Sequence, residues 1–310
     1  MTAQVRSLLT LAVIGLAASC TNAGADQAAP AGTLTDSDLA AQTFEERFER
    51  FDAGADLAPG RNTHRWRTVM GYGGPSAFSN FRISNSSIGI DRDFPGVVQG
   101  KLGREPLGLD PFEVSPGQSL TIVGRPVPPA LSAKVWGAKY YSGQITTKFS
   151  FAQRYGYFEV EAILPAGKGF WPSFWLLPVK GRWPVGGEID VFEGLGDPRV
   201  IYTSLHWGAD HQRQQRKVTL PFDASAGFHR YGVAWTPEHI AWYVDRREVF
   251  RAPTPPEVQD EMFLILGLGV GGPWGGYPDA STQFPGRYTV RSVRAWKLSG
   301  TYLRDHGQTP

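Results

Sequence analysis

Short runs of alternating or continuous apolar residues recur along the chain, and they predict β-strands rather than long helices. Residues 156–164 (GYFEVEAIL) place Phe, Val and Ala on one face, with Tyr and two Glu on the other. Residues 287–298 (RYTVRSVRAWKL) also alternate, and 239–252 (HIAWYVDRREVFRA) predict two short strands around a charged turn. The Thr- and aromatic-rich run 144–151 (QITTKFSF) predicts a further strand. Residues 262–270 (MFLILGLGV) are continuously apolar, which is typical of a strand buried on both faces.

Glycine and proline punctuate these segments throughout, with 37 Gly and 24 Pro in 310 residues. No repeat at a fixed period and no second linker is visible, so the pattern favours one domain from about residue 42 to 298. Many short strands with few crossover helices predict an all-β fold, a sandwich of two antiparallel sheets. If the sheets curve, we expect a concave face that can hold a long ligand.

The two ends of the chain lack this alternation. Residues 21–41 are small and polar and predict a flexible tether. Residues 38–51 (DLAAQTFEERFERF) favour a helix by propensity, which the following FDAGADLAPG would soon end. Residues 299–310 (SGTYLRDHGQTP) predict a polar, mobile tail.

The first 20 residues predict an export signal. A positive residue, Arg6, precedes an apolar run that is too short to span a bilayer, and small residues follow. The stretch LAASC resembles a bacterial lipobox, which makes Cys20 a candidate lipidation site; Ala17 stands where such motifs usually carry Leu. The AGA at 23–25 fits an ordinary signal-peptidase site instead. We therefore expect a periplasmic, envelope-anchored or extracellular protein whose membrane contact is limited to that possible lipid.

Composition narrows the classes of partner. Cys20 is the one cysteine, so the mature domain has neither disulfides nor a thiolate metal site. The 31 basic and 29 acidic residues nearly balance, which gives no indication of nucleic-acid binding. The basic run at 211–218 (HQRQQRKV) is interpreted as a solvated loop, or alternatively as a rim that contacts an acidic ligand. We expect a monomer.

Three carboxylates in VGGEIDVFEGLG carry the candidate chemistry. On a regular strand Glu188 and Asp190 would share a face, and Glu193 would point to the other. A β-bulge within DVFE would return Glu193 to the face of the other two and turn Ile189 and the intervening apolar residues toward the core. The two Glu Cα atoms would then lie on the order of 13 Å apart, and the side chains can lean inward.

A retaining glycosidase needs such a set of acids. One carboxylate attacks the sugar and a protonated carboxyl donates to the leaving oxygen, with the two groups about 5–5.5 Å apart. Neighbouring acids help one another stay protonated, and Asp190 lies where it can share a proton and orient a nucleophile. The alternative is an acidic strand edge that only prevents aggregation. The apolar residues between the acids, which imply a buried face, and the nearby tryptophans argue against it.

Tryptophans cluster around these acids, among ten in the chain. Trp171 and Trp175 are four residues apart and share a face on a strand, whereas Trp183 and Trp274 lie in Gly/Pro-rich loops. Core packing explains a single Trp, but flat aromatics beside acids also suit the stacking of sugar rings. His206, in YTSLHWG, is interpreted either as a structural hydrogen-bonding residue or as one that orients substrate or acid.

These motifs together resemble glycoside hydrolase family 16. GEIDVFE is similar to the bulged E-x-D-x-x-E signature, and the upstream SGQITTKFSFAQRYGYFEVEAILPAGKGFWPSFWLLP and the downstream SLHWG and GGPWGGYPDASTQFPG follow the order of its laminarinase-like members. The resemblance implies a β-jelly roll and retaining endo-hydrolysis of a β-linked polysaccharide, most simply β-1,3- or β-1,3/1,4-glucan. It also implies a nucleophile, an assisting acid and a general acid/base at Glu188, Asp190 and Glu193. The implied substrate-binding residues are Trp171, Trp175, Trp183, His206 and Trp274.

Two departures from that family pattern affect the expectations. Gln144 stands where laminarinase-like members often carry Arg or Lys, which puts a sugar contact in doubt. Arg291 stands where many members have an Asp that helps to hold a structural calcium, so no metal is predicted. No organic cofactor is expected either, because both catalytic groups would be carboxyls. The alternatives are a lectin-like binding sandwich, and a hydrolase or transglycosylase acting on agar, carrageenan or a bacterial exopolysaccharide.

Overall fold

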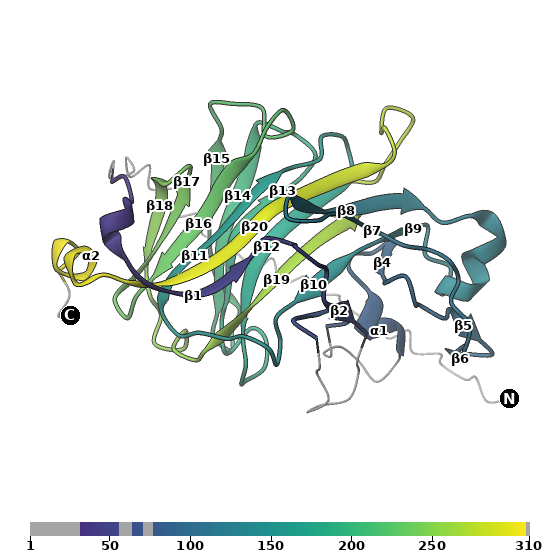
Figure 1. Cartoon of the computed structure of the whole chain (residues 1–310), viewed down its shortest axis with the longest axis horizontal. Coiled ribbons are helices and arrows are strands. Elements are labelled where there is room, and N and C mark those ends of the chain that lie inside the picture. Colours follow the sequence, from purple (N-terminus) through teal and green to yellow (C-terminus); the bar gives the residue numbers. More distant parts are fainter. Residues whose placement is uncertain (1–31, 56–63, 71–76, 308–310) are drawn as a thin grey trace, which may run out of the picture.

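Two large β-sheets face each other across an apolar core (Figure 1). The computed structural model describes residues 32–55, 64–70 and 77–307. Pairing is antiparallel apart from the short β2–β3 and β4–β9 pairs, which are parallel. The predicted all-β jelly-roll sandwich is confirmed.

One sheet has ten strands and the other has eight. In order across the sheet, the ten-stranded sheet contains β18 (Arg247–Pro253), β17 (His239–Val244), β16 (His229–Trp235), β11 (Gly156–Ile163), β20 (Gly286–Leu298), β8 (Ser119–Pro126), β9 (Tyr140–Ser142) and β4 (Ser87–Gly89), with β1 (Leu39–Glu46) paired to β20 and β7 (Phe112–Ser115) paired to β8. The eight-stranded sheet contains β15 (Gln212–Thr219), β14 (Val200–Trp207), β13 (Glu188–Gly194), β12 (Phe170–Pro178), β19 (Met262–Val270), β10 (Gln144–Thr146), β3 (Trp66–Arg67) and β2 (Ala53–Gly54).

The remaining elements are short. They are the pair β5 (Val97–Val98) and β6 (Lys101–Leu102), the 3-10 helices η1 (Asp36–Asp38) and η2 (Pro129–Val135), and the helices α1 (Ala77–Phe81) and α2 (Gly300–Asp305). None of the helices in the described ranges is long and apolar enough to cross a membrane.

The core forms where the predicted alternation turns apolar side chains between the sheets. Phe158 and Val160 of β11 are fully buried in the same core as Phe174 and Leu176 of β12, a strand of the other sheet. Strand β19 is buried along its whole length, as its continuous apolar run predicts. The charged turn after β17 is also confirmed, with β18 beginning at Arg247.

Two N-terminal predictions are wrong: the flexible tether, for residues 32–41, and the helix at 38–51. Residues 39–46 form strand β1 on β20 instead of a helix, and Phe44 is buried in the core. Before it, Leu34 is buried, and Asp36 forms an ion pair with Arg246. Strand pairing and burial outweigh local helix propensity here. The rest of the predicted tether, the export signal and Cys20 lie outside the described residues.

The prediction of a mobile tail is wrong for residues 299–307. Ser299 caps helix α2 by accepting a hydrogen bond from the Tyr302 backbone N–H at 3.2 Å. Tyr302 is 1% exposed, and its hydroxyl lies 3.1 Å from that of Tyr243. An aromatic side chain in an otherwise polar tail thus fixes the segment by burying its ring.

Two strand boundaries also differ from the predictions. The strand at 144–151 ends at Thr146, because Thr147 begins a turn in which its carbonyl accepts from Phe151. The basic run predicted as a loop is strand β15, paired along its whole length with β14 at the edge of the eight-stranded sheet. Its backbone hydrogen bonds need no apolar alternation, and cationic side chains suit an exposed edge.

Candidate active site

A β-bulge on β13 gathers the three acids on one face of the sheet. Asp190 pairs with Ser204 and Glu193 with Tyr202, so two residues of β13 oppose one residue of β14. On the other side, the register with β12 slips at the same place. The extra residue restores Glu193 to the face of Glu188 and Asp190, as the sequence predicts.

The residues between the acids point into the sandwich. Ile189, Val191 and Phe192 are at most 2% exposed and belong to the main core. The carbonyl oxygen of Asp190 accepts a hydrogen bond from Nε1 of Trp242, 2.8 Å away in the opposite sheet. The bulge is therefore held from the core side by both packing and a buried hydrogen bond.

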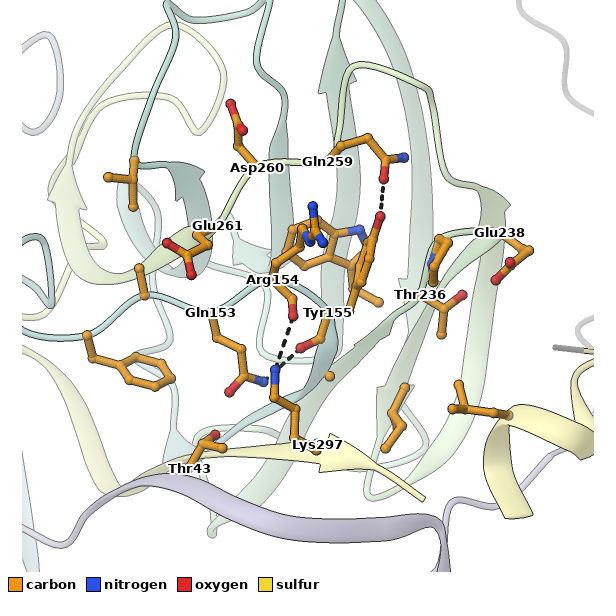
Figure 2. A pocket seen from close by; sticks show the side chains of 18 of the residues that line it. Thr43, Gln153, Arg154, Tyr155, Thr236, Glu238, Gln259, Asp260, Glu261 and Lys297 are labelled. Carbon is orange, nitrogen blue, oxygen red and sulfur yellow. Dashed lines mark hydrogen bonds between the residues drawn. The ribbon is translucent and has the colours of Figure 1, made fainter. Parts of the chain in front are cut away.

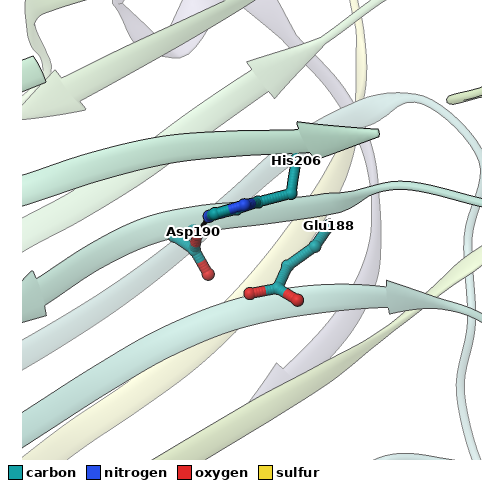
Figure 3. A group of neighbouring side chains, drawn as sticks. All are labelled: Glu188, Asp190 and His206. Carbon is teal, nitrogen blue, oxygen red and sulfur yellow. Dashed lines mark ion pairs between the residues drawn. The ribbon is translucent and has the colours of Figure 1, made fainter. Parts of the chain in front are cut away.

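Glu188 and Asp190 lie beside His206 (Figure 3). His206 is paired with Glu188 across β13 and β14, and its Nε2 lies 3.4 Å from Oδ2 of Asp190. That Oδ2 accepts no hydrogen bond from the described residues. His206 Nδ1 lies 3.0 Å from Nε2 of His211, so a polar chain runs from the buried Asp190 to an exposed ring.

Aromatic side chains lie on both sides of the acids. On one side Trp171 donates a hydrogen bond from Nε1 to Oε1 of Glu193 at 3.0 Å. Trp274 packs edge-on against Trp171 at 5.4 Å and also contacts Tyr202 at 5.2 Å. Trp274 is 40% exposed, so part of this aromatic surface faces solvent.

On the other side Trp183 lies over the two histidines. Its ring centroid is 4.7 Å from that of His211 and 6.4 Å from that of His206. Trp183 is 53% exposed, and it partly counteracts the rise in the pKa of Glu188. Trp175, the remaining predicted aromatic, pairs with Asp190 across β12 and β13 and is half-buried.

Burial perturbs all three carboxyl groups. It raises the pKa of Glu188 well above the usual value, helped by repulsion from Asp190. The pKa of Asp190 is also raised well above its usual value, by burial and then by repulsion from Glu193. Burial, and then the charge of Glu188, raises the pKa of Glu193 to about 8. Glu193 therefore holds a proton at neutral pH, which is the state that a general acid requires.

Glu188 and Asp190 behave as a pair. Beyond the dominant effect of burial, the hydrogen bond between their side chains raises the pKa of Glu188 and lowers that of Asp190. Burial and mutual repulsion thus favour retention of a proton by the pair. Burial lowers the pKa of His206, so its ring is neutral beside them.

Glu188, Asp190 and His206 also offer a possible set of metal ligands. One ligand atom from each lies within 4.8 Å of the others, and no other such group occurs in the described ranges. Two carboxylates and an imidazole fit a divalent cation by donor type. The predicted absence of a metal stays a prediction.

The structure brings together all eight residues predicted for the catalytic and binding site, on β12, β13, β14 and two neighbouring loops. Sequence reasoning missed Tyr202, His211 and Trp242. Tyr202 lies four residues before His206 on β14 and therefore shares its face, a signal that could have found it. Gln144, a departure from the family pattern, is only 7% exposed. The cation at Arg291 forms an ion pair with Glu161 at 2.6 Å.

A cavity of about 920 Å³ opens elsewhere in the molecule (Figure 2). It is lined by both acidic and basic side chains, and the hydroxyl of Tyr155 donates a hydrogen bond to Gln259 at its wall. None of the predicted site residues lines this cavity. The acid-bearing face of the eight-stranded sheet is therefore the candidate active site.

Comparison with known proteins agrees with this geometry. Residues 121–284 match the model of the glycosyl hydrolases family 16. The chain is 42% identical over 165 residues to the endo-1,3-1,4-beta-glycanase ExsH of Rhizobium meliloti (strain 1021), covering 53% of this chain and 35% of that protein. It is 38% identical over 194 residues to the endo-1,3-1,4-beta-glycanase EglC of the same organism, covering 62% and 41%. The chain thus spans less than half the length of these curated relatives.

A solved structure extends the likeness over most of the fold. The laminarinase catalytic domain of Thermotoga maritima MSB8 superposes with a TM-score of 0.61 at 27% identity. The match covers 83% of this chain and 98% of that domain.

Proposed function

The chain belongs to glycosyl hydrolases family 16, and on that premise we propose that it is a retaining endo-glycosidase acting on β-1,3- or mixed β-1,3-1,4-glucan. The observation that carries the proposal is the bulge, which sets Glu188, Asp190 and Glu193 on one face with Glu193 protonated at neutral pH. The names of the relatives, endo-1,3-1,4-beta-glycanase and laminarinase, support the choice of substrate.

In this proposal Glu193 is the general acid/base. Its proton goes to the glycosidic oxygen as the bond to the leaving sugar breaks, and the resulting carboxylate then activates water. Trp171 holds the carboxyl group through Nε1 and fixes its direction. Trp274, packed on Trp171, offers a partly exposed ring against which a sugar can stack.

Glu188 is the nucleophile and Asp190 its partner. The shared proton moves along their hydrogen bond to Asp190, so that Glu188 attacks the anomeric carbon as a carboxylate. His206, neutral and 3.4 Å from Asp190, supplies a polar neighbour for that proton. The developing positive charge of the sugar favours this transfer, because it stabilises the ionised Glu188.

The direct test is the release of reducing ends from laminarin and lichenan by the full chain and by Glu188→Gln. We expect the wild type to release short oligosaccharides while the variant, with an unchanged Tm, releases none. Proton NMR of the first products should show the β-anomer. Unchanged turnover by the variant, or α-anomeric product, would reject the assignment.

A lectin-like function without turnover predicts a different result. In that case both proteins would be retarded in gels containing laminarin or lichenan, and neither would release reducing ends. The complete acid set favours hydrolysis, because sugar binding alone does not require a protonated Glu193. Product analysis on agarose, carrageenan and acidic exopolysaccharides, with and without an acceptor sugar, separates the other substrates and transglycosylation.

We also propose that the protein is exported and lipidated at Cys20. The support is the sequence of the leader, with its apolar run followed by LAASC. Metabolic labelling with a palmitate analogue tests this directly: the wild type should take up label and Cys20→Ser should not. Secretion of the unlabelled wild type would instead support cleavage near AGA.

A further inference from the structure

Strand β15 lies at the edge of the sheet, and some of its residues are in register with the acids of β13. The register from β13 through β14 places Arg213 in one row with Glu188, and Lys217 in one row with Glu193. Directly opposed residues of antiparallel strands point to the same face. Both cations therefore stand on the face that carries the acids, two strands away.

These two cations lie on the edge strand of the eight-stranded sheet. Arg213 and Lys217 are exposed, and neither forms an ion pair with a carboxylate in the described ranges. Between them Gln215 donates from Nε2 to Oγ of Ser204 at 3.0 Å. The edge strand thus presents a cation, a tethered amide and a second cation at alternate positions.

Distance separates this edge from the reacting groups. Strands lie roughly 4.8 Å apart, so β15 is about 10 Å from β13, and four residues along the strand separate the two cations by about 13 Å. Negative charge close to the acids is disfavoured by the carboxylates themselves. At the edge strand, an anionic group on the same ligand meets positive charge instead.

The aromatic groups connect the edge to the acids. Trp183 packs against His206 and His211, and His206 stands in the row of Arg213. Tyr202 stands in the row of Lys217, and Trp274 packs against it. A sugar chain that crosses the strands from the acids to the edge therefore passes aromatic surfaces before it meets the cations.

We propose that Arg213 and Lys217 form a subsite for anionic substituents, carboxylate or sulfate, on the polysaccharide that occupies this face. The inference rests on the proposed function for the identity of the ligand as a glycan. The Arg213 guanidinium offers paired N–H donors to a planar anion, and Lys217 adds a point charge. The substrate class is accordingly an acidic β-glycan, with the charged group about two strand spacings from the scissile bond.

The test compares laminarin with carboxymethylated and sulfated laminarin of matched length. Binding is measured by affinity electrophoresis in a Glu188→Gln background, so that turnover does not alter the ligand. Arg213→Gln, Lys217→Gln and the double variant are compared with Lys134→Gln, which removes an exposed cation on η2, away from this face. The ratio of kcat/KM for charged over neutral laminarin is measured in the same set with Glu188 intact.

We expect tighter binding of at least one charged laminarin than of the neutral one, with a preference that weakens as salt rises. Each single variant should lower that preference roughly threefold to tenfold, and the double variant by about the product, because the sites are well separated. Lys134→Gln should keep it. Whichever charged polymer is preferred identifies carboxylate or sulfate as the source.

Two outcomes would overturn the subsite: no preference for either charged polymer in the wild type, or a preference that the double variant retains. Failure of the proposed function looks different. In that case no laminarin is cleaved by any variant, while binding of the charged polymers still depends on Arg213 and Lys217.

Discussion

Trp171 donates a hydrogen bond from its indole Nε1 to Oε1 of Glu193 at 3.0 Å, from the strand next to the bulge. This bond opposes the effect of burial, because it stabilises the ionised carboxylate. It also directs the carboxyl group on an otherwise flexible side chain. Trp171 therefore links the aromatic surface to the pKa of the proposed acid.

Replacement of Trp171 by Phe should shift the pH–rate profile. Loss of the hydrogen bond raises the pKa of Glu193, so the alkaline limb of kcat/KM, expected near pH 8 in the wild type, should move upward. The lost bond should also lower kcat/KM below that limb roughly fivefold, from about 1 kcal/mol. Trp274→Phe, as a control, should change KM and leave the limb in place. An alkaline limb that moves downward would contradict the argument.

Azide should distinguish the two glutamates. With an activated aryl β-glycoside, Glu188→Gly leaves space for azide to attack the anomeric carbon directly, which gives an α-glycosyl azide. Glu193→Ala leaves the nucleophile intact, so azide attacks the covalent intermediate and gives a β-glycosyl azide. NMR of the products reads the anomeric configuration. The opposite pairing of variant and product would exchange the two roles.

The stability of the protein should fall as Glu193 ionises. Its pKa rises from 4.5 to about 8 on folding, so the native state binds the proton more tightly than the unfolded state. The stabilisation that protonation gives is fully present below pH 4.5 and is lost progressively up to about pH 8. Glu193→Gln removes this dependence, so its Tm relative to the wild type should increase from pH 5 to 8.5. Glu238→Gln, at an exposed loop position, serves as the control.

Trp242→Phe tests whether the bulge is held from the core. The variant keeps an aromatic ring but leaves the Asp190 carbonyl without its donor at 2.8 Å. We expect a loss of about 1–3 kcal/mol in the free energy of unfolding, measured in urea, together with a lower kcat. Trp235→Phe is a matched control, because the buried Nε1 of Trp235 has no hydrogen-bond partner in the described ranges. Equal losses in the two variants would remove the special role of the bond.

Removal of metals should leave the reaction intact, since the proposed steps use carboxyl groups alone. Dialysis against EDTA should not change kcat. Added Zn²⁺ should inhibit instead, because Glu188, Asp190 and His206 can bind it with the nucleophile among the ligands. Activity that is lost on chelation and restored by one metal would contradict the carboxyl mechanism.

Much of the site could be predicted because it depends on the spacing of residues along single strands. The spacing of Glu188, Asp190 and Glu193, with apolar residues between them, fits one face only if a bulge is present, and the register confirms it. The positions of Trp171 and Trp175 follow from their spacing on one strand. Helix propensity at 38–51 misled for the opposite reason, since pairing with the distant β20 decides the state of that segment.

The sequence by itself determined which residues alternate, where apolar runs become buried strands, and that Glu188 and Asp190 share a face. Those properties depend on backbone periodicity and on neighbours a few positions away. Only the tertiary structure decided that Trp242 holds the bulge, that His211 meets His206, and that Arg213 and Lys217 stand in register with the acids. These contacts join segments through strand register and the packing of two sheets, which no local pattern specifies.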